Sequence, residues 1–195
     1  AEVAIGMKSV EEAVAVRNWV LERIEVASLE ENEDARRRAL TFVIVGGGFA
    51  GIETIAELED MAREAVKRND RLRVSDLRFV LVEAAPRIMP EVPADRAEKV
   101  VAELRARGIE VLLNTSLADA TDGHLALINM GDKSPAGELD TDTLIWTAGV
   151  AASPMLKDTD FPIDERGRVR VGADLRVTGD NGVIEGAWAA GDRSE

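Results

Sequence analysis

The sequence predicts an α/β protein built around a Rossmann-like nucleotide-binding domain. Two observations carry this prediction. Between residues 41 and 113, apolar runs of strand length alternate with segments whose apolar residues recur every three to four positions, which is typical of parallel strands joined by helices. A glycine cluster, GGGFAG, stands directly between the first such strand and the first such helix, where dinucleotide-binding folds place a phosphate-binding turn.

The first 40 residues are expected to form a helix and a linker. Ser9 and Glu12 match a capping box, and apolar residues then recur with helical spacing, so a helix is predicted over residues 9–27. The following SLEENEDARRRAL places acids before bases. This order predicts a short solvated helix or a linker that ends at Leu40.

A βαβαβ unit follows. Residues 41–45 (TFVIV) and 77–82 (LRFVLV) predict buried strands, and residues 109–113 (IEVLL) predict a third. An amphipathic pattern predicts a long helix from the glycine cluster to about Asn69, and a second helix over residues 94–107 is closed by Gly108. This order implies right-handed crossovers and a doubly wound sheet.

The pattern changes after residue 113. Short apolar pieces at residues 116–120 and 125–129, separated by the turn signals DG and GD, predict a small antiparallel meander. Residues 143–147 (TLIWT) predict a return strand. Beyond it we expect a turn at 165–167, an alternating strand at 168–171 and a last strand at 187–190. The predicted domains are residues 1–40, 41–148 and 149–195.

Composition restricts the class of function. The chain has 195 residues, 46% of them hydrophobic, and a formal net charge of -13, so it can bury a core and offers no basic surface to nucleic acid. It contains no cysteine, which removes disulfides and thiolate chemistry and is typical of a reducing compartment. No apolar run approaches the roughly 20 residues of a membrane span. Because no span is expected and cysteine is absent, we expect a soluble, cytoplasmic protein. No metal-ligand cluster stands out, so we expect no metal site.

The glycines match the pattern G-x-G-x-x-G at Gly46, Gly48 and Gly51, with Gly47 as an extra glycine. In this pattern the first glycine allows a sharp turn, the second lets the backbone approach a pyrophosphate, and the third lets the helix pack closely. Amides at the helix N-terminus then supply the anion site. The strand before the motif and the helix after it favour nucleotide binding over a purely structural turn.

Glu83 ends the second predicted strand. A carboxylate there can accept hydrogen bonds from ribose hydroxyls and would repel a 2′-phosphate, which favours NAD over NADP. Glu83 lies further from Gly51 than such acids usually do, and Arg87 is close enough to complicate the selectivity. The alternative is an acidic residue in an ordinary loop.

A few other residues invite a functional interpretation. Glu53 falls in the expected first turn of the nucleotide helix, where electrostatics alone indicate an acid that compensates the helix dipole. His124, the only histidine, follows a turn signal, which indicates a solvated hairpin rather than a general base. Trp19, Trp146 and Trp188 fall in apolar segments, which predicts core packing.

Taken together, these residues resemble the flavoprotein pyridine-nucleotide oxidoreductases, and within them the type II NADH:quinone dehydrogenases. The resemblance covers nearly the whole chain and rests on MKSVEEAVAVRNWVLERIE, FVIVGGGFAGIETIAELEDMA, LRFVLVEAAPRIMPE, LIWTAGVAASP with ERGRVRV, and GAWAAGD. It implies an enzyme whose NAD domain is inserted into an FAD domain. NADH would give a hydride to FAD, and the reduced flavin would pass two electrons to a membrane quinone.

The resemblance also implies roles for single residues. The family has a glutamate matching Glu53 near the nicotinamide and the flavin, which makes Glu53 a candidate catalytic residue in positioning or proton handling. Ala148 and Gly149 would form the crossover that passes the nicotinamide, and Gly191 and Asp192 would contact FAD. The implied NAD site as a whole comprises Gly46, Gly48, Gly51, Glu83, Ala148 and Gly149.

Departures from the family pattern predict a central fragment. The family's first glycine motif, which binds the FAD pyrophosphate, is not in this sequence, and neither is the C-terminal part that completes the flavin site and anchors to the membrane. Residues 1–40 and 149–195 would then be incomplete pieces of the FAD domain. We expect the fragment to bind NADH without flavin or activity. The full-length protein would lie on the cytoplasmic face of a membrane, and an oligomer is compatible with it.

Two alternatives stay open at this point. One is another two-domain reductase of the disulfide or ferredoxin type, although the long first helix and LVEAAPRIMPE favour the quinone branch. The other is a regulatory module that binds NADH and performs no chemistry. Assays of the full-length protein with a quinone and a disulfide separate the enzymes, and the upstream sequence separates an enzyme from a sensor.

Overall fold

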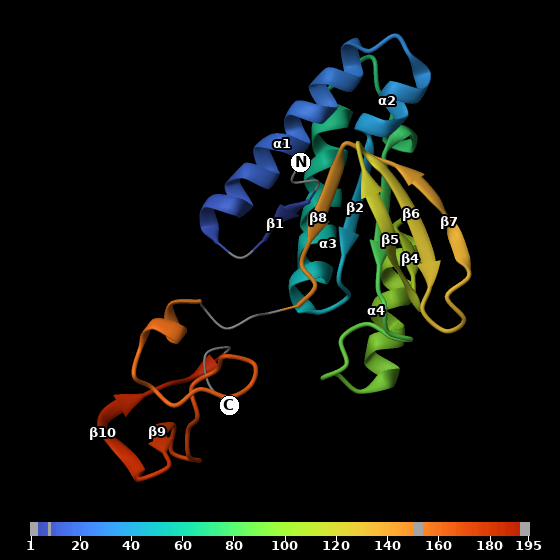
Figure 1. The fold of residues 1–195 in the computed structure, drawn as a ribbon. Coiled ribbons are helices and arrows are strands. Elements are labelled where there is room, and N and C mark those ends of the chain that lie inside the picture. The colour runs from blue at the N-terminus through green and yellow to red at the C-terminus, as the bar shows by residue number, and fades with distance from the viewer. Residues whose placement is uncertain (1–3, 8, 150–153, 192–195) are drawn as a thin grey trace. The chain divides into compact units, whose positions relative to one another are not determined.

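The computed structural model describes residues 4–7, 9–149 and 154–191 (Figure 1). The chain forms two compact units, Ala1–Ala148 and Gly149–Glu195. Within the described residues, every α-helix and every strand of the parallel sheet belongs to the first unit.

Two helices precede the sheet's central strand. Helix α1 spans Val10–Leu29 and begins with the predicted capping box, since the Ser9 hydroxyl accepts from the Glu12 amide and the Glu12 carboxylate accepts from the Ser9 amide. Helix α2 spans Glu33–Ala39, and the Asn32 side chain caps it by accepting two amides. The acid-rich start and basic end of α2 complement its dipole, which confirms the short helix that the charge order predicted.

Five parallel strands form the central sheet, in the order β1-β8-β2-β3-β4. All five residues of β2 are buried, as their unbroken apolar pattern predicted. The edge strand β1 has only two residues and pairs with β8, a partner that the sequence analysis missed. The strands are β1 (Ile5–Gly6), β2 (Thr41–Val45), β3 (Arg78–Val82), β4 (Glu110–Leu112) and β8 (Thr143–Trp146).

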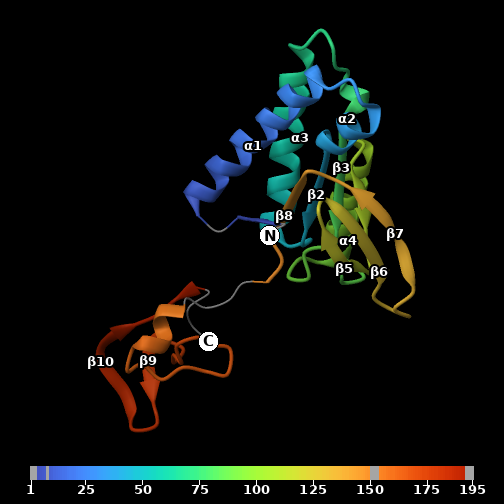
Figure 2. The same ribbon diagram turned by 45° about the horizontal axis from the view of Figure 1, so that its top comes forward.

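Helices cover one face of this sheet. Helix α3 (Phe49–Lys67) follows β2, a short 3-10 turn η1 (Val74–Asp76) precedes β3, and α4 (Ala94–Ala106) leads to β4. Helix α1 lies beside α3 (Figures 1 and 2). Side chains from these helices and from alternate positions of the strands share one apolar core, which includes Val16, Val20, Phe42, Ile44, Ile55, Ala62, Phe79, Leu81, Leu104 and Ile145.

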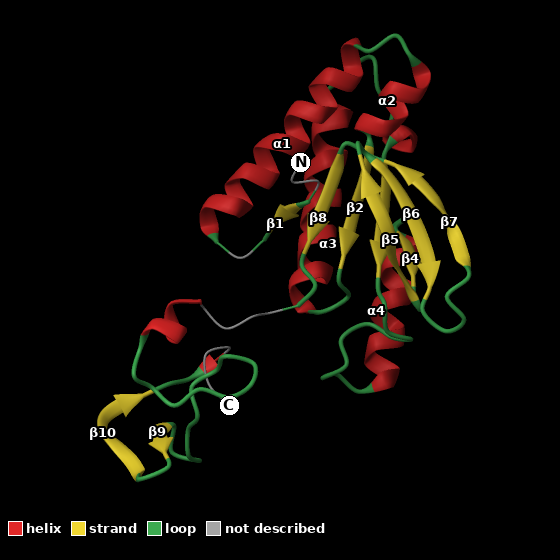
Figure 3. Cartoon of the chain, viewed as in Figure 1, coloured by secondary structure: helices red, strands yellow, loops and turns green. Residues whose placement is uncertain are grey.

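An antiparallel meander covers the opposite face (Figure 3). It consists of β5 (Thr115–Thr121), β6 (His124–Asn129) and β7 (Pro135–Asp140). Leu125, Leu127 and Leu139 pack on the other alternate positions of β2, β3 and β8. The meander and the Rossmann-like sheet are therefore as predicted. The doubly wound arrangement is not, because strands rather than helices bury the second face.

Residues 1–40 pack with residues 41–148 and not apart from them. Ala39 and Leu40 lie in the same core as the helices and strands of the sheet, and the chain divides between Ala148 and Gly149 rather than at Leu40. The assignment of residues 1–40 and 149–195 to a flavin-binding domain stays a prediction.

The second unit has a small core of its own, built from Leu156, Val169 and Val177. It contains a 3-10 turn η2 (Pro154–Asp158) and the antiparallel strands β9 (Arg176–Gly179) and β10 (Gly182–Trp188). The strand expected at 168–171 is present only as isolated bridges, and the one expected at 187–190 ends at Trp188. Short strands with one exposed face carry a weak sequence signal.

The tryptophans do not share one role. The Trp19 indole is partly buried and donates to the Thr143 hydroxyl at 3.0 Å. Trp146 and Trp188 are 40% and 65% exposed, so core packing was the wrong prediction for both. Each is the last residue of its strand.

Candidate nucleotide-binding site

The glycine loop leaves the C-terminal end of β2 and is fixed there by its own packing. Gly46 has φ +115°, and a Cβ built on it would lie 2.7 Å from the Ala148 nitrogen and 2.7 Å from the Thr147 hydroxyl oxygen. A Cβ on Gly51 would lie 1.8 Å from the Gly46 carbonyl oxygen. The first and third motif glycines are thus required by the protein's own atoms, for a left-handed turn and for close contact of helix and turn.

Gly48 differs from both, because a Cβ built on it meets no atom within 4 Å. Gly48 is the N-cap of α3, and no side chain of the described residues caps this helix. The amides of the first turn have no acceptor inside the helix, and the helix dipole makes this end attractive to an anion. The exposed backbone and the helix end together form a surface suited to a pyrophosphate.

Glu83 lies directly after β3 and is held by the backbone. Its Oε2 accepts from the Gly47 amide, and its Oε1 accepts from the Ala85 amide at 2.7 Å. The backbone amide of Glu83 donates to the Leu112 carbonyl oxygen at 2.8 Å, which ties the residue to β4. The carboxylate is partly buried and stands beside the glycine loop, so the structure brings Glu83 and the glycine motif together.

Gly47 is an extra glycine in the sequence pattern, and its contacts show why the position favours glycine. Its amide donates to Glu83 Oε2, and its carbonyl oxygen accepts from the Met89 amide at 2.8 Å. A Cβ on Gly47 would lie 2.9 Å from Glu83 Oε2 and 2.9 Å from the buried Ile88 side chain. The run of three consecutive glycines was a visible signal in the sequence, but the reason for a glycine at position 47 depends on residues far along the chain.

Arg87 is engaged within its own loop. Its Nη1 donates to the Val92 carbonyl oxygen at 2.9 Å, and its Nη2 donates to the Pro90 carbonyl oxygen. The guanidinium therefore closes residues 87–92 into a compact turn.

The crossover after β8 touches the glycine loop. The Thr147 hydroxyl donates to the Val45 carbonyl oxygen at 2.9 Å, and the Trp146 indole donates to the Ala148 carbonyl oxygen at 2.7 Å. These bonds place Ala148 against Gly46. Gly149 begins the second unit with φ +76°, a conformation that favours glycine.

Glu53 is the fifth residue of α3, so it does not lie in the first turn as expected. Its side chain is exposed and lines a cavity of about 450 Å³ between α1 and α3. Most of the other lining residues are apolar, among them Met7, Ala13, Val16, Leu58 and Met61. Among the described residues, no hydrogen bond joins the Glu53 side chain to the glycine loop or to Glu83.

The two predicted flavin contacts belong to the second unit. Gly191 is exposed and has φ +74°, and a Cβ built on it meets no atom within 4 Å. Asp192 lies outside the described residues.

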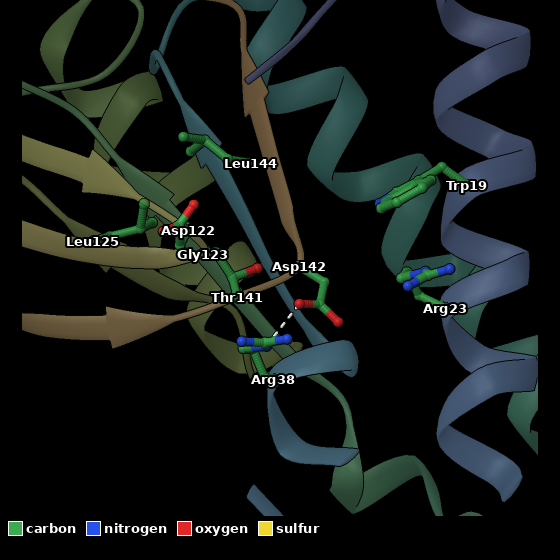
Figure 4. Close-up of a pocket in the computed structure, with 9 residues that line it drawn as sticks. All are labelled: Trp19, Arg23, Arg38, Asp122, Gly123, Leu125, Thr141, Asp142 and Leu144. Atoms are coloured by element: carbon green, nitrogen blue, oxygen red, sulfur yellow. Dashed lines mark ion pairs between the residues drawn. The ribbon is translucent and has the colours of Figure 1, made fainter. Parts of the chain in front are cut away.

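Another pocket, of about 260 Å³, lies where β2 and β8 begin, at the end of the strands opposite the glycine loop (Figure 4). Two of its charged side chains form an ion pair, and a third stacks on an aromatic ring. Arg38 pairs with Asp142 at 2.7 Å, and the Arg23 guanidinium carbon lies 4.2 Å from the centre of the Trp19 ring. The Arg38–Asp142 pair joins α2 to the start of β8, and the Trp19 indole joins α1 to the same strand through the Thr143 hydroxyl, so this pocket is a structural junction.

His124 is the first residue of β6, and its side chain is about half exposed. A hydrogen bond from the imidazole Nδ1 to the Asp140 carboxylate, 2.9 Å long, raises the pKa of His124 above its usual value, and the charges of Asp140, Glu138 and Asp119 add to the rise. The residue sits on the meander, consistent with the predicted solvated hairpin.

The described residues contain neither a candidate metal site nor a candidate membrane-spanning helix. No group of three or more His, Cys, Asp or Glu side chains there could hold a metal ion. Among the helices in this part of the chain, none combines the length and the apolar character that a bilayer crossing requires.

Comparison with protein families decides the relationship. A family model described as Pyridine nucleotide-disulphide oxidoreductase matches residues 8–194. The chain belongs to this family. The family-level resemblance that the sequence motifs indicated is therefore confirmed.

Curated relatives of this pyridine nucleotide-disulphide oxidoreductase include NADH dehydrogenases. The chain is 29% identical over 184 residues to the type II NADH:quinone oxidoreductase Ndh of Mycobacterium tuberculosis, and 32% identical over 178 residues to a probable NADH dehydrogenase of Dictyostelium discoideum. These matches cover 92% and 90% of the chain but 39% and 38% of the relatives. The chain thus spans about two fifths of the length of these relatives.

Solved structures agree on the fold. NDH2 from Plasmodium falciparum in complex with NADH matches 99% of this pyridine nucleotide-disulphide oxidoreductase chain with a TM-score of 0.83 at 22% identity, and the match covers 40% of that protein. A NAD-dependent persulfide reductase from A. fulgidus matches 100% of the chain with a TM-score of 0.61 at 20% identity, covering 30% of that protein. Both likenesses support the Rossmann-like prediction.

Proposed function

We propose that this chain is the NADH-binding part of a flavoprotein NADH dehydrogenase that passes electrons to a quinone. The glycine loop carries the proposal: Gly46 and Gly51 are fixed by the protein's own atoms, whereas Gly48 presents open backbone at the N-terminus of α3. A purely structural turn has no need of a glycine at an open position. The names of the curated relatives supply the reaction.

The adenosine half of NADH is held beside β3. The backbone at Gly48 and the first amides of α3 take the pyrophosphate. Glu83 takes the adenosine ribose, because each of its carboxylate oxygens accepts one backbone amide and keeps further acceptor capacity for a ribose hydroxyl. NADH is preferred over NADPH, since Glu83 repels a 2′-phosphate and the Arg87 guanidinium is bound to carbonyl oxygens of its own loop.

The nicotinamide half passes the crossover after β8. Ala148 lies against Gly46, and Gly149 supplies the positive φ at which the chain turns away. Glu53 has a role near the nicotinamide, in positioning or in holding a proton, as the exposed carboxylate on the α1-facing side of α3.

The flavin site is assigned to Gly191 and Asp192. The positive φ and open surroundings of Gly191 fit close approach of a ligand to the backbone. When bound, FAD supplies the capacity to accept a hydride from NADH and release its electrons one or two at a time. The quinone comes from the names of the curated relatives. The cytoplasmic face of a membrane and the option of an oligomer rest only on the resemblance of the sequence motifs to the family.

Two measurements test this function. Calorimetric titration of the 195-residue chain with NADH should show binding, and Gly48→Ala should weaken it about tenfold by intruding on the pyrophosphate. The native gene product, assayed with FAD, should oxidise NADH with a water-soluble quinone faster than with a disulfide. A folded chain that binds no NADH, or a gene product that reduces only the disulfide, would contradict the proposal.

A further inference from the structure

The phosphate loop and the segment that carries the ribose carboxylate are joined through the backbone of one residue, Gly47. The Gly47 amide donates to Glu83 Oε2, and the Gly47 carbonyl oxygen accepts from the Met89 amide at 2.8 Å. Both faces of this short loop segment are thus bonded to the segment that follows β3. Neither Gly47 nor Met89 belongs to the motif residues that contact a dinucleotide.

The segment after β3 is itself held closed. Arg87 donates to the carbonyl oxygens of Val92 and Pro90, and Met89 has φ 46°, an uncommon conformation for a residue with a side chain. The hydrogen bond from Met89 to Gly47 supports this conformation, and the buried Ile88 packs beside Gly47. The segment therefore has few ways to move without releasing Glu83.

We propose that the Gly47 amide and the Arg87 guanidinium are positioning groups that fix the Glu83 carboxylate for the adenosine ribose. Both groups then control the preference for NADH over NADPH without touching the nucleotide. This inference rests on the proposed function. Without the Gly47 amide the carboxylate can rotate away from the ribose, and a 2′-phosphate then meets less repulsion.

Gly47→Ala is the sharpest perturbation. The φ of Gly47 lies outside the left-handed region, so alanine is compatible with the backbone. Its Cβ would stand 2.9 Å from Glu83 Oε2 and 2.9 Å from Cγ2 of the buried Ile88, so the flexible Glu83 side chain must yield and the Ile88 side chain must shift slightly. The substitution should displace the carboxylate and leave the fold in place. Gly48→Ala is the matched control, because its Cβ meets no protein atom within 4 Å.

The probes are ADP-ribose and 2′-phospho-ADP-ribose, titrated calorimetrically into the 195-residue chain. Wild type should prefer ADP-ribose. Gly47→Ala should reduce this preference about tenfold, the factor that one hydrogen bond to a charged group supplies. Gly48→Ala should weaken both probes alike, since both carry the pyrophosphate. An unchanged preference in Gly47→Ala would overturn the proposal.

Arg87 variants distinguish an arginine that positions the loop from one that binds the 2′-phosphate. If Arg87 positions the loop, Arg87→Gln and Arg87→Lys should both reduce the preference for ADP-ribose, because neither side chain can bond two carbonyl oxygens in the same fork. If Arg87 instead receives the 2′-phosphate, Arg87→Gln should increase that preference and Arg87→Lys should resemble wild type, which would refute the proposal. These variants also carry the test should Gly47→Ala fail to fold by circular dichroism.

Different outcomes contradict the proposed function and the positioning role. A folded wild-type chain that binds neither probe defeats the proposed function itself. A wild-type chain that prefers ADP-ribose, with the same preference in Gly47→Ala and Arg87→Gln, defeats only the positioning role.

Discussion

Arg107→Ala should be among the most destabilising substitutions away from the nucleotide site. The Glu59 side chain on α3 is only 2% exposed, and its carboxylate is bonded by Arg63 and by Arg107. Arg107 donates its Nε to Glu59 at 3.0 Å and its Nη2 to the Ala56 carbonyl oxygen at 2.8 Å. This residue thus binds the end of α4 to the middle of α3 through a carboxylate that has little access to water.

The expected loss of unfolding free energy depends on the Glu59 carboxylate, which stays buried when Arg107 is removed. Removing one partner of a buried ion pair costs about 3–5 kcal/mol, because the remaining charge is uncompensated. Since Arg63 still contacts Glu59, we expect the lower end, about 3 kcal/mol. Arg63→Ala should cost less, because Arg63 is more exposed than Arg107, 37% against 26%, and Arg107 retains its own bonds to Glu59.

Urea unfolding followed by circular dichroism at 222 nm measures this cost. All α-helices of the described residues belong to the first unit, so the helical signal reports on the unit that contains Glu59. Arg96→Ala is the matched control, an exposed arginine on α4 whose loss should change stability by less than about 0.5 kcal/mol.

A second variant tests the reason for the cost. If the penalty is an unpaired buried charge, Glu59→Gln added to Arg107→Ala should restore about 1 kcal/mol or more, because the neutral amide is cheaper to bury. A loss below about 1 kcal/mol in Arg107→Ala, or a double variant less stable than the single one, would refute the reasoning.

Three further predictions concern the loop, the meander and α3. Gly51→Ala should cost about 3 kcal/mol or more in urea unfolding, because its Cβ would stand 1.8 Å from a carbonyl oxygen; wild-type stability would show that the turn can yield. The hydrogen bond to Asp140 raises the pKa of His124 above 6.5, so its protonated ring stabilises the fold below pH 6.5, and that contribution is lost as the pH rises through the raised value. His124→Asn should therefore lower the melting temperature near about pH 5.5 and leave it unchanged near about pH 8.5, and the opposite pH dependence would contradict the assignment. Glu53→Gln in the native enzyme should slow NADH oxidation while NADH binding to this chain is retained, whereas unchanged hydride-transfer and quinone-reduction rates would return Glu53 to the class of surface acids.

The sequence was sufficient where a signal is local. The bounds of β2 were predicted to the residue, because five consecutive apolar residues mark a strand buried on both faces. The start of α1 was predicted from the Ser9 and Glu12 pair, whose reciprocal bonds involve only neighbouring residues. The strand and glycine patterns then placed the glycine loop and Glu83 at the ends of two strands, which are neighbours in the sheet.

The sequence was insufficient where the partner is distant. Strand β1 has two residues, too few for any periodicity, and exists because it pairs with β8 at the other end of the first unit's sequence. The prediction that helices would cover both faces of the parallel sheet was wrong for a related reason. The apolar pattern of the meander strands predicts strands but does not indicate against which face of the sheet they pack. Exposure of Trp146 depends on its position at a strand end, which an apolar run does not reveal.

The four glycines of the loop show why a motif match understates what a structure can assign. Gly46 and Gly51 face the protein's own backbone, Gly47 faces a carboxylate and a buried isoleucine, and Gly48 faces open space. Substitutions at these positions should therefore be measured by different assays: stability at Gly46 and Gly51, nucleotide affinity at Gly48, and nucleotide preference at Gly47. The sequence shows the same residue at all four positions, but the atoms that an added Cβ would contact differ from one position to the next. Those atoms decide which property each glycine protects.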